Sequence, residues 1–272
     1  MNGAIIGDIV GSVYEIKNNK TKKFKLFENN STYTDDTIMT CAIGLASMDY
    51  YQNSNQKLFK QNCIKYMKLL GRMYPNAGYG GTFIRWIFSS NLGPYNSYGN
   101  GSAMRVSSVA DVANSLEEAE ILAEISASVT HNHPEGIKGA KAVAGAIWLA
   151  KNDYSKKEIY DYINRNYYKL NFKIDDIRES YKFDVSCQGS VPQAIQCFIE
   201  SENFEDCIRN AISLGGDSDT IAAISGSIAG KFYEIPNELI ESAQNYLDNN
   251  LKLIVNRYNK LFNIKGEKVN ER

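Results

Sequence analysis

Apolar residues recur at intervals of three or four positions along most of the chain, which is the spacing of one buried helix face. No segment shows the alternation of a half-buried strand. We expect helices at residues 3–14, 35–50, 55–71, 81–89, 115–129, 135–151, 156–168, 191–201, 204–213 and 218–232, and one long or two short helices within 236–262. The pattern predicts an all-α fold of about ten helices. Because no linker or repeat divides the chain, we expect one compact domain over 1–264, followed by a flexible tail at 265–272.

Several residues indicate where helices begin and where loops lie. Ser115 opens a predicted capping box and Ser155 is a predicted N-cap. Pro192 indicates the first turn of a helix, because proline is tolerated there. Residues 169–187 have no period and are expected to be loop, as is most of 72–102.

Glycines recur every four residues in the first predicted helix, where Gly3, Gly7 and Gly11 share one face. Glycine inside a helix lowers its stability, so such a face predicts close packing against a neighbouring helix. Gly226 and Gly230 repeat the same spacing in the helix at 218–232.

The composition excludes several classes of protein. With 43% hydrophobic and 22% charged residues, the chain is neither disordered nor of low complexity. A formal net charge of −1 gives no basis for general nucleic-acid binding, and no run of about 18 apolar residues predicts a membrane span. The five cysteines form no C-x-x-C pair, and the N-terminus lacks the basic flank of a signal peptide. We therefore expect a cytoplasmic protein.

Two short acidic segments each open an almost wholly apolar helix. Residues 34–37 read Thr-Asp-Asp-Thr, and residues 217–220 read Asp-Ser-Asp-Thr. For one segment alone, helix capping explains the residue types, because Asp, Ser and Thr are favoured at N-caps and the helix dipole stabilises negative charge there.

The two segments together are harder to explain as caps. Apolar helices are buried, so their acidic starts are at least partly buried, and buried carboxylates need protons, basic partners or cations. Neither segment has a Lys or Arg nearby in sequence. If the two helix starts converge, the four negative charges of their carboxylates balance the four positive charges of two divalent cations. Oxygen ligands suit Mg²⁺ or Mn²⁺, and the absence of His and Cys argues against zinc.

Five motifs, in order along the chain, resemble those of the ADP-ribosylglycohydrolase family, which includes hydrolases of ADP-ribosylated arginine and serine. They are GAIIGDIVGSVYE at 3–15, YTDDT at 33–37, YGNGSAMRV at 98–106, SVTH at 128–131 and GGDSDTI at 215–221. Each motif alone is weak, but five in this order are specific. The resemblance implies an all-α domain with a central cleft that holds two Mg²⁺ or Mn²⁺ ions.

By matching position, the resemblance implies that the metal ligands are Thr34, Asp35, Asp36, Asp217, Asp219 and Thr220. This agrees with the charge argument, which does not depend on it. The base that orients the attacking water would be Asp35, Asp36 or Asp219. Glu15 matches a family glutamate that sits over the metal site; we favour a gating or substrate-orienting role for it, and a direct acid–base role stays open.

The resemblance also implies a cleft for ADP-ribose, lined by Tyr79, Gly80, Asn100, Gly101, Ser102, Met104 and His131. Without it, the glycine-rich residues 98–105 would be an ordinary turn, although glycine lets a backbone approach a ligand closely. A structural role is the alternative for Arg105. The resemblance implies that His131, rather than His133, contacts the substrate pyrophosphate.

The implied reaction is hydrolysis of the α-glycosidic bond at C1″ of the distal ribose, which releases ADP-ribose from a protein or small molecule. Arginine is the expected acceptor and the expected enzyme is a monomer. Loops 16–32, 72–98 and 165–190 are expected to choose the acceptor. Three alternatives stay open: a non-hydrolytic ADP-ribose reader, a structural relative of the family, and a phosphatase of the haloacid dehalogenase type, which would need a β-strand before Asp217.

Overall fold

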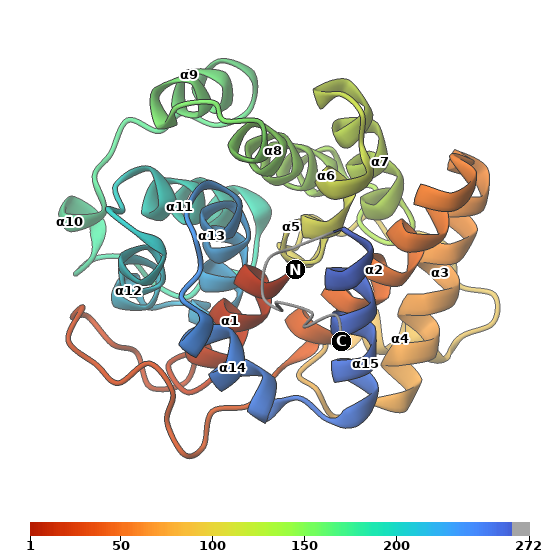
Figure 1. Ribbon diagram of the computed structural model, residues 1–272, viewed down its shortest axis with the longest axis horizontal. Coiled ribbons are helices and arrows are strands. Elements are labelled where there is room, and N and C mark those ends of the chain that lie inside the picture. The colour runs from red at the N-terminus through yellow and green to blue at the C-terminus, as the bar shows by residue number, and fades with distance from the viewer. Residues whose placement is uncertain (263–272) are drawn as a thin grey trace, which may run out of the picture.

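Helices account for nearly all regular structure in residues 1–262, which are the residues that the computed structural model describes (Figure 1). Their bounds are α1 (Asn2–Gly11), α2 (Asp35–Asn53), α3 (Gln56–Met73), α4 (Gly81–Phe88), α5 (Gly101–Met104), the 3₁₀ helix η1 (Val106–Ser108), α6 (Val109–Val112), α7 (Leu116–Ser128), α8 (Pro134–Lys151), α9 (Lys156–Asn166), α10 (Ile174–Ile177), α11 (Cys187–Ile199), α12 (Phe204–Leu214), α13 (Ser218–Phe232), α14 (Asn237–Tyr246) and α15 (Asn249–Leu261).

The all-α prediction is confirmed. Within residues 1–262 the structure contains no named strand, and its one isolated β-bridge joins Gly99 to Ser186. Residues 236–262, for which the sequence allowed one long or two short helices, contain two helices, α14 and α15. No helix in this part of the chain has both the length and the apolar composition that a membrane span requires. The predicted domain end at 264 and the tail at 265–272 lie outside the described residues.

The predicted start of α11 is wrong. The helix begins at Cys187, where the Ser186 hydroxyl caps it by accepting a hydrogen bond from the Gly189 N–H (3.1 Å). Pro192 therefore lies inside the helix, where it cannot donate to the carbonyl of Gln188. The predicted loop at 169–187 also contains the short helix α10.

The two predicted caps differ in detail. Ser155 and Glu158 form a complete capping box at α9. Ser115 accepts from the Glu118 N–H (3.1 Å) at α7, but the Glu118 carboxylate accepts from the Asn114 N–H (2.7 Å) instead of the N–H of Ser115. The second half of the Ser115 box prediction is therefore wrong.

The glycine face of α1 packs against α13, as its spacing predicts. Gly3 lies against the backbone of Gly226, Gly7 against Ala222, and Gly11 against Asp219. Because no side chain separates the two backbones, α1 and α13 approach more closely than ordinary helices do. In Figure 1, α1 lies near the middle of the molecule, with α11 and α12 on one side and α2 and α15 on the other.

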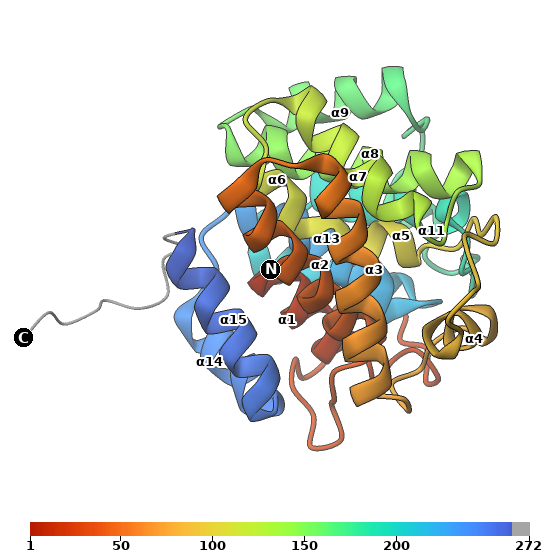
Figure 2. The ribbon, with the colours of Figure 1, turned by 90° about the vertical axis from the view of Figure 1, so that its right-hand side faces the viewer.

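The remaining helices surround this central pair. In Figure 2, α7, α8 and α9 lie at one end of the molecule and α14 with α15 at its side. The core is continuous through these layers and includes the fully buried Trp86. Both acidic segments lie at the N-terminal ends of helices, at Asp35 of α2 and before Ser218 of α13.

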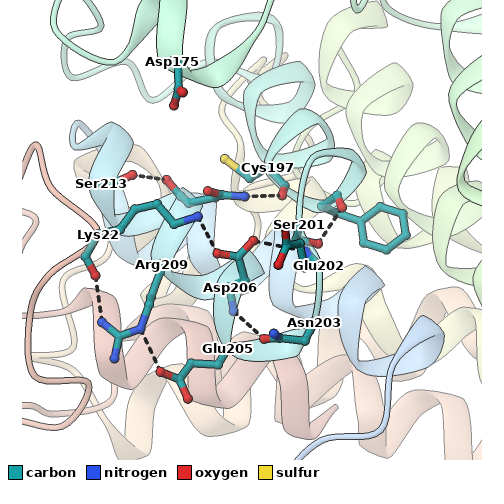
Figure 3. A network of polar contacts seen from close by, with 12 residues as sticks. Lys22, Asp175, Cys197, Ser201, Glu202, Asn203, Glu205, Asp206, Arg209 and Ser213 are labelled. Carbon is teal, nitrogen blue, oxygen red and sulfur yellow. Dashed lines mark hydrogen bonds and ion pairs between the residues drawn. The ribbon is translucent and has the colours of Figure 1, made fainter.

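A polar network fastens the loop between α1 and α2 onto α12 (Figure 3). Arg209 Nη1 donates to the carbonyls of Lys22 (2.9 Å) and Phe24 (2.8 Å), and its Nε pairs with Glu205 (2.7 Å). Lys22 also pairs with Asp206. Because α12 leads directly into the second acidic segment, the network holds this loop beside that segment.

The Lys-rich stretch 17–25 is more than a solvated loop, because one of its lysines bonds to the rest of the fold. Lys20 is half-buried, and its Nζ donates to the carbonyls of Arg178 (2.7 Å), Tyr181 (2.9 Å) and Leu214 (2.7 Å). Its ammonium group satisfies three carbonyls that helix ends and turns leave unpaired.

We expect Gly7→Ala to destabilise the protein by about 1–3 kcal/mol, because the new methyl group would overlap the backbone of Ala222 and Ala223. Gly93→Ala is the matched control, since no atom lies within 4 Å of the position of its Cβ. Urea unfolding followed by circular dichroism measures both. Equal stability of the two variants would contradict the close approach of α1 and α13.

Candidate active site

A cavity of about 580 Å³ opens where the ends of several helices meet. Residues within 34–36, 77–83, 95–105 and 217–220 form most of its wall, and the wall is completed by Glu15, His131, Phe183 and Val185. Its volume is typical of a small-molecule site. One part of the wall is acidic, and another part carries an arginine and a histidine.

The two acidic segments meet in this cavity, as the charge argument predicts. Asp36, Asp217 and Asp219 are all buried. The Thr220 hydroxyl donates to Asp36 Oδ2 (3.1 Å), which joins the first segment to the second. Thr34 lies on the same wall. All six residues that the sequence assigns to metal binding therefore line one cavity.

Asp8, which the sequence reasoning missed, belongs to the same cluster. Its fully buried carboxylate accepts hydrogen bonds from the N–H groups of Thr34 (2.9 Å) and Thr37 (2.9 Å) and from the Thr34 hydroxyl (2.7 Å). A signal for it exists in the sequence, because Asp8 is the single charged residue of an otherwise apolar and glycine-rich helix. Buried charges in such positions need a specific partner.

Two overlapping groups of carboxylates have the spacing of metal sites. Oxygens of Asp8, Asp36 and Asp219 lie within 4.8 Å of one another, and so do oxygens of Glu15, Asp217 and Asp219. Asp219 belongs to both groups. Asp35 belongs to neither, so its predicted role as a ligand has less geometric support than the roles of Asp36, Asp217 and Asp219.

The residues present fit a divalent cation. Asp36 Oδ1 is buried and has no hydrogen-bond partner among the described residues, although a buried carboxylate oxygen needs one. None of these carboxylates forms an ion pair with a Lys or Arg of residues 1–262. An all-oxygen set of this kind is typical of Mg²⁺ or Mn²⁺ sites.

Burial and mutual repulsion raise the pKa values of the acids. Burial, with Asp8 and Asp217 adding to it, raises the pKa of Asp35 to about 8. Burial also raises the pKa values of Asp36 and Asp219 well above the usual range, and that of Glu15 in the same direction. Without a cation, this cluster is therefore stable only when it holds protons.

Asp35 is the most accessible aspartate of the first segment. Its side chain is half-buried and lines the cavity, and its N–H donates to the carbonyl of Ala77 (2.8 Å). That bond connects the segment to the loop 74–80, which precedes α4 and also contributes to the cavity wall. Gly78 follows Ala77 with a φ of 99°, a conformation that favours glycine.

Arg105 both lines the cavity and has a structural role, which are the two possibilities that the sequence left open. It is buried and lines the cavity, and its Nη2 donates to the carbonyl of Ser126 (3.1 Å) and to the Thr130 hydroxyl (3.0 Å). Its Nε is buried without a partner in the described part of the chain. Burial lowers the pKa of Arg105 to about 10, so it stays charged at neutral pH.

His131 is a neutral group on the same part of the wall. Its Nδ1 lies 2.7 Å from the Thr130 hydroxyl, and burial followed by the charge of Arg105 lowers its pKa well below the usual range. Its Nε2 is directed towards Gly101. His133 instead caps α8, where its Nδ1 accepts from the Glu135 N–H (3.1 Å), and it is not on the cavity wall.

Four other predicted lining residues are on the wall, and two are not. Gly80, Asn100, Gly101 and Met104 line the cavity. Asn100 also donates from its amide nitrogen to Asp217 Oδ2 (2.7 Å).

Ser102 and Tyr79 are the exceptions. The Ser102 hydroxyl is buried and donates to the carbonyl of Gly136 (2.7 Å), so it holds α5 against α8. The Tyr79 ring packs on the wall residue Phe83, with a centroid distance of 5.7 Å, but Tyr79 does not itself line the cavity. Their side chains therefore support the site without lining it.

Three residues behind the wall fasten the two segments that meet at Asp35. The Asp248 carboxylate accepts from the hydroxyls of Tyr74 (2.7 Å) and Tyr33 (3.5 Å), and it also caps α15. Tyr33 directly precedes the first acidic segment, and Tyr74 begins the loop 74–80 between α3 and α4. One carboxylate therefore sets the distance between both segments.

The comparison with protein families follows this geometry. A sequence model described as ADP-ribosylglycohydrolase matches residues 1–267. The chain belongs to the ADP-ribosylglycohydrolase family. It is an enzyme, a glycosidase, and the acidic cluster is the feature of this chain that agrees with a metal-dependent family.

Several relatives support this assignment. ADP-ribosylhydrolase ARH3 of Bos taurus is 25% identical over 90% of this chain and 87% of the relative, and the Homo sapiens protein of that name is 26% identical over 90% and 88%. ADP-ribosylarginine hydrolase Tri1 of Pseudomonas putida is 31% identical over 53% of this chain and 41% of its own. A structure named ADP-ribosylglycohydrolase-related protein complex shares the fold, with a TM-score of 0.63 and 21% identity over 94% and 95% of the two chains.

We expect Tyr74→Phe to weaken Mn²⁺ binding by about tenfold, because the loop that bonds to Asp35 loses its anchor while Asp248 still caps α15. Tyr66→Phe is the matched control, since it also loses a 2.7 Å hydrogen bond to an aspartate, Asp49, far along α2. Calorimetric titration with Mn²⁺ measures both. Equal Mn²⁺ affinities in the two variants would show that the anchor has no effect on the site.

We expect the metal-free protein to lose stability as the pH rises from about 4 to 8. The raised pKa of Asp35 means that folding favours its protonated form, so that contribution is complete near pH 4 and is lost as the pH approaches 8. Thermal unfolding in EDTA should show this fall, and Asp35→Asn should reduce it. A loss of equal size in wild type and variant would contradict the assigned pKa.

Proposed function

We propose that the protein hydrolyses the glycosidic bond at C1″ of ADP-ribose in a metal-dependent reaction and releases ADP-ribose from a modified acceptor. The observation that carries the proposal is a cluster of acids in which Glu15, Asp36, Asp217 and Asp219 line the cavity and the buried Asp8 adjoins Asp36 and Asp219. Arg105 lines the same cavity. The acids suit cations, and the arginine suits the diphosphate of ADP-ribose.

Two Mg²⁺ or Mn²⁺ ions are the cofactors that this cluster favours. Asp8, Asp36 and Asp219 would hold one ion, and Glu15, Asp217 and Asp219 would hold the other. When bound, such ions orient the ribose hydroxyls and lower the pKa of water. The hydroxyls of Thr34 and Thr220, two of the six ligands that the sequence predicts, lie beside these acids. Asp35, a third predicted ligand, is not part of either group.

Asp35 is the group that we assign to orient the attacking water. It is half-buried, lines the cavity and belongs to neither carboxylate group, so its oxygens are free to accept a proton. Asp36 and Asp219 are buried within the ligand groups and act mainly through charge. The transition state of glycoside cleavage resembles an oxocarbenium ion, which the remaining negative charge of the cluster stabilises.

Glu15 lies where a substrate-orienting residue is needed. It is half-buried, lines the cavity and ends the turn that follows α1, so it can contact both the ribose and the ion beside Asp217. We assign it the orienting role, and the raised pKa of its carboxyl group is compatible with proton exchange as well.

Arginine is the acceptor that the charge of the site favours. The structure adds Asp8 and Glu15 to the four carboxylates of the two segments, which gives six negative charges against the four positive charges of two divalent cations. The remaining negative charge favours a cationic leaving group such as guanidine. The name of the Pseudomonas putida relative also specifies arginine.

The alternative functions have less support. A phosphatase of the haloacid dehalogenase type would need a β-strand before Asp217, whereas α12 and a two-glycine turn precede it. An ADP-ribose reader or a structural relative would have no use for the buried cluster of acids. We keep the cytoplasm as the proposed location, since all five cysteines are free and buried, and a monomer as the proposed state.

We expect the purified protein to release ADP-ribose from mono-ADP-ribosylated arginine in Mg²⁺ or Mn²⁺ and not in EDTA. Chromatography of free ADP-ribose measures release, and ADP-ribosylated serine is the competing substrate. Release from serine alone would contradict the proposal that arginine is the acceptor. Binding of ADP-ribose without release from either substrate would favour the reader.

Asp35→Ala and Asp217→Ala should each reduce turnover more than about 100-fold while the helical circular dichroism is unchanged. Asp161→Ala is the control, because it removes only an exposed pair with Lys157. Full activity in either of the first two variants would contradict the proposed site.

A further inference from the structure

Two loops meet at the edge of the cavity beside Gly216. The Asn18 side chain accepts from the Gly216 N–H (2.6 Å), and Lys20 Nζ donates to the carbonyls of Arg178 (2.7 Å) and Tyr181 (2.9 Å). The Tyr181 ring also packs over Gly216. Loops 16–20 and 178–185, which are far apart in sequence, are therefore fixed to each other next to Asp217.

The second loop lines the cavity, the first loop begins directly after the cavity residue Glu15, and both loops expose large apolar side chains. Glu15 lines the cavity just before the first loop, and Phe183 and Val185 line it within the second. The exposed fraction is 93% for Ile16, 52% for Phe183 and 53% for Val185. Single exposed apolar residues are common, but several beside a cavity indicate a binding surface.

Lysines accompany these apolar residues. Lys17 follows Ile16 and Lys182 precedes Phe183; both are exposed, and neither forms an ion pair within residues 1–262. We call Ile16, Lys17, Lys182, Phe183 and Val185 the rim. The rim carries two positive charges. Asp184, which lies between Phe183 and Val185, is the one acid within residues 182–185, and its carboxylate accepts a hydrogen bond from the Ser186 N–H (2.8 Å). The adjacent part of the cavity is acidic.

The rim lies beside the part of the cavity where we expect the acceptor. Glu15 and Asp217, which border the rim, belong to one of the two carboxylate groups. If the ions lie there, the bond between ADP-ribose and its acceptor is broken at this side of the cavity. The acceptor chain then leaves the cavity across the rim.

We propose that the rim binds the polypeptide around the modified side chain and selects acceptor proteins with apolar and acidic residues beside it. The apolar side chains bury matching side chains, and the two lysines attract carboxylates. This inference rests on the proposed hydrolase function, which supplies the place of the acceptor.

The test compares two peptides that carry ADP-ribosylated arginine, one flanked by Leu and Glu and the other by Ser and Lys. We expect kcat/KM to be about tenfold higher for the first, which corresponds to one modest contact surface. Ile16→Ser and Lys182→Glu should each reduce that preference at least about threefold through KM, while turnover of free ADP-ribosylarginine is unchanged. Leu253→Ser on α15 and Lys57→Glu on α3 are matched exposed controls.

Two results would overturn the inference. One is an equal kcat/KM for both peptides. The other is loss of free ADP-ribosylarginine turnover in Lys182→Glu, which would assign the lysine to the ADP-ribose diphosphate instead of the peptide.

Failure of the proposed function gives a different result. If free ADP-ribosylarginine is not hydrolysed at all, fluorescence anisotropy of the two labelled peptides bound to the wild-type protein still tests the rim. A tighter Kd for the Leu and Glu peptide, lost in Ile16→Ser, supports the rim. Equal Kd values overturn it.

Discussion

Repulsion among buried carboxylates is the physical constraint on which the rest of this site depends. Asp8, Asp36, Asp217 and Asp219 are buried together, and burial raises the pKa values of all four. Neighbouring acids of the cluster raise the pKa values of Asp36 and Asp219 further. A cluster of this kind lowers stability unless protons or cations neutralise it. Hydrogen bonds to Asp8 from Thr34 and Thr37 offset part of that cost. A divalent cation held by these acids would offset the remainder.

Helix packing brings these acids close enough to share cations. Asp8 lies on α1, Asp36 on α2 and Asp219 on α13. Gly11 lies against the backbone of Asp219, so the glycine face that lets α1 touch α13 also determines the distance between their acids. The core and the site are therefore consequences of the same contact, and a larger residue at this face would disturb both.

The sequence predicts much of this arrangement. Helical periodicity locates most helices, and the two acidic segments indicate a shared site, because their residue types and apolar helices form a local pattern. Asp8 is missed because one carboxylate in a helix has no local pattern. Its role depends on bonds to Thr34 and Thr37, which are distant in sequence. The sequence also does not predict where the side chains of Ser102, Tyr79 and Lys20 point, because side-chain direction depends on tertiary packing. Resemblance to the family locates the rest of the cavity.

The number of cations bound per chain tests this account most directly. Equilibrium dialysis of the purified protein against Mn²⁺ at neutral pH, with the bound ion counted by electron paramagnetic resonance, measures it. Two carboxylate groups that share Asp219 predict two ions per chain and loss of both in Asp219→Ala. One ion per chain, or two that persist in Asp219→Ala, would contradict the shared site.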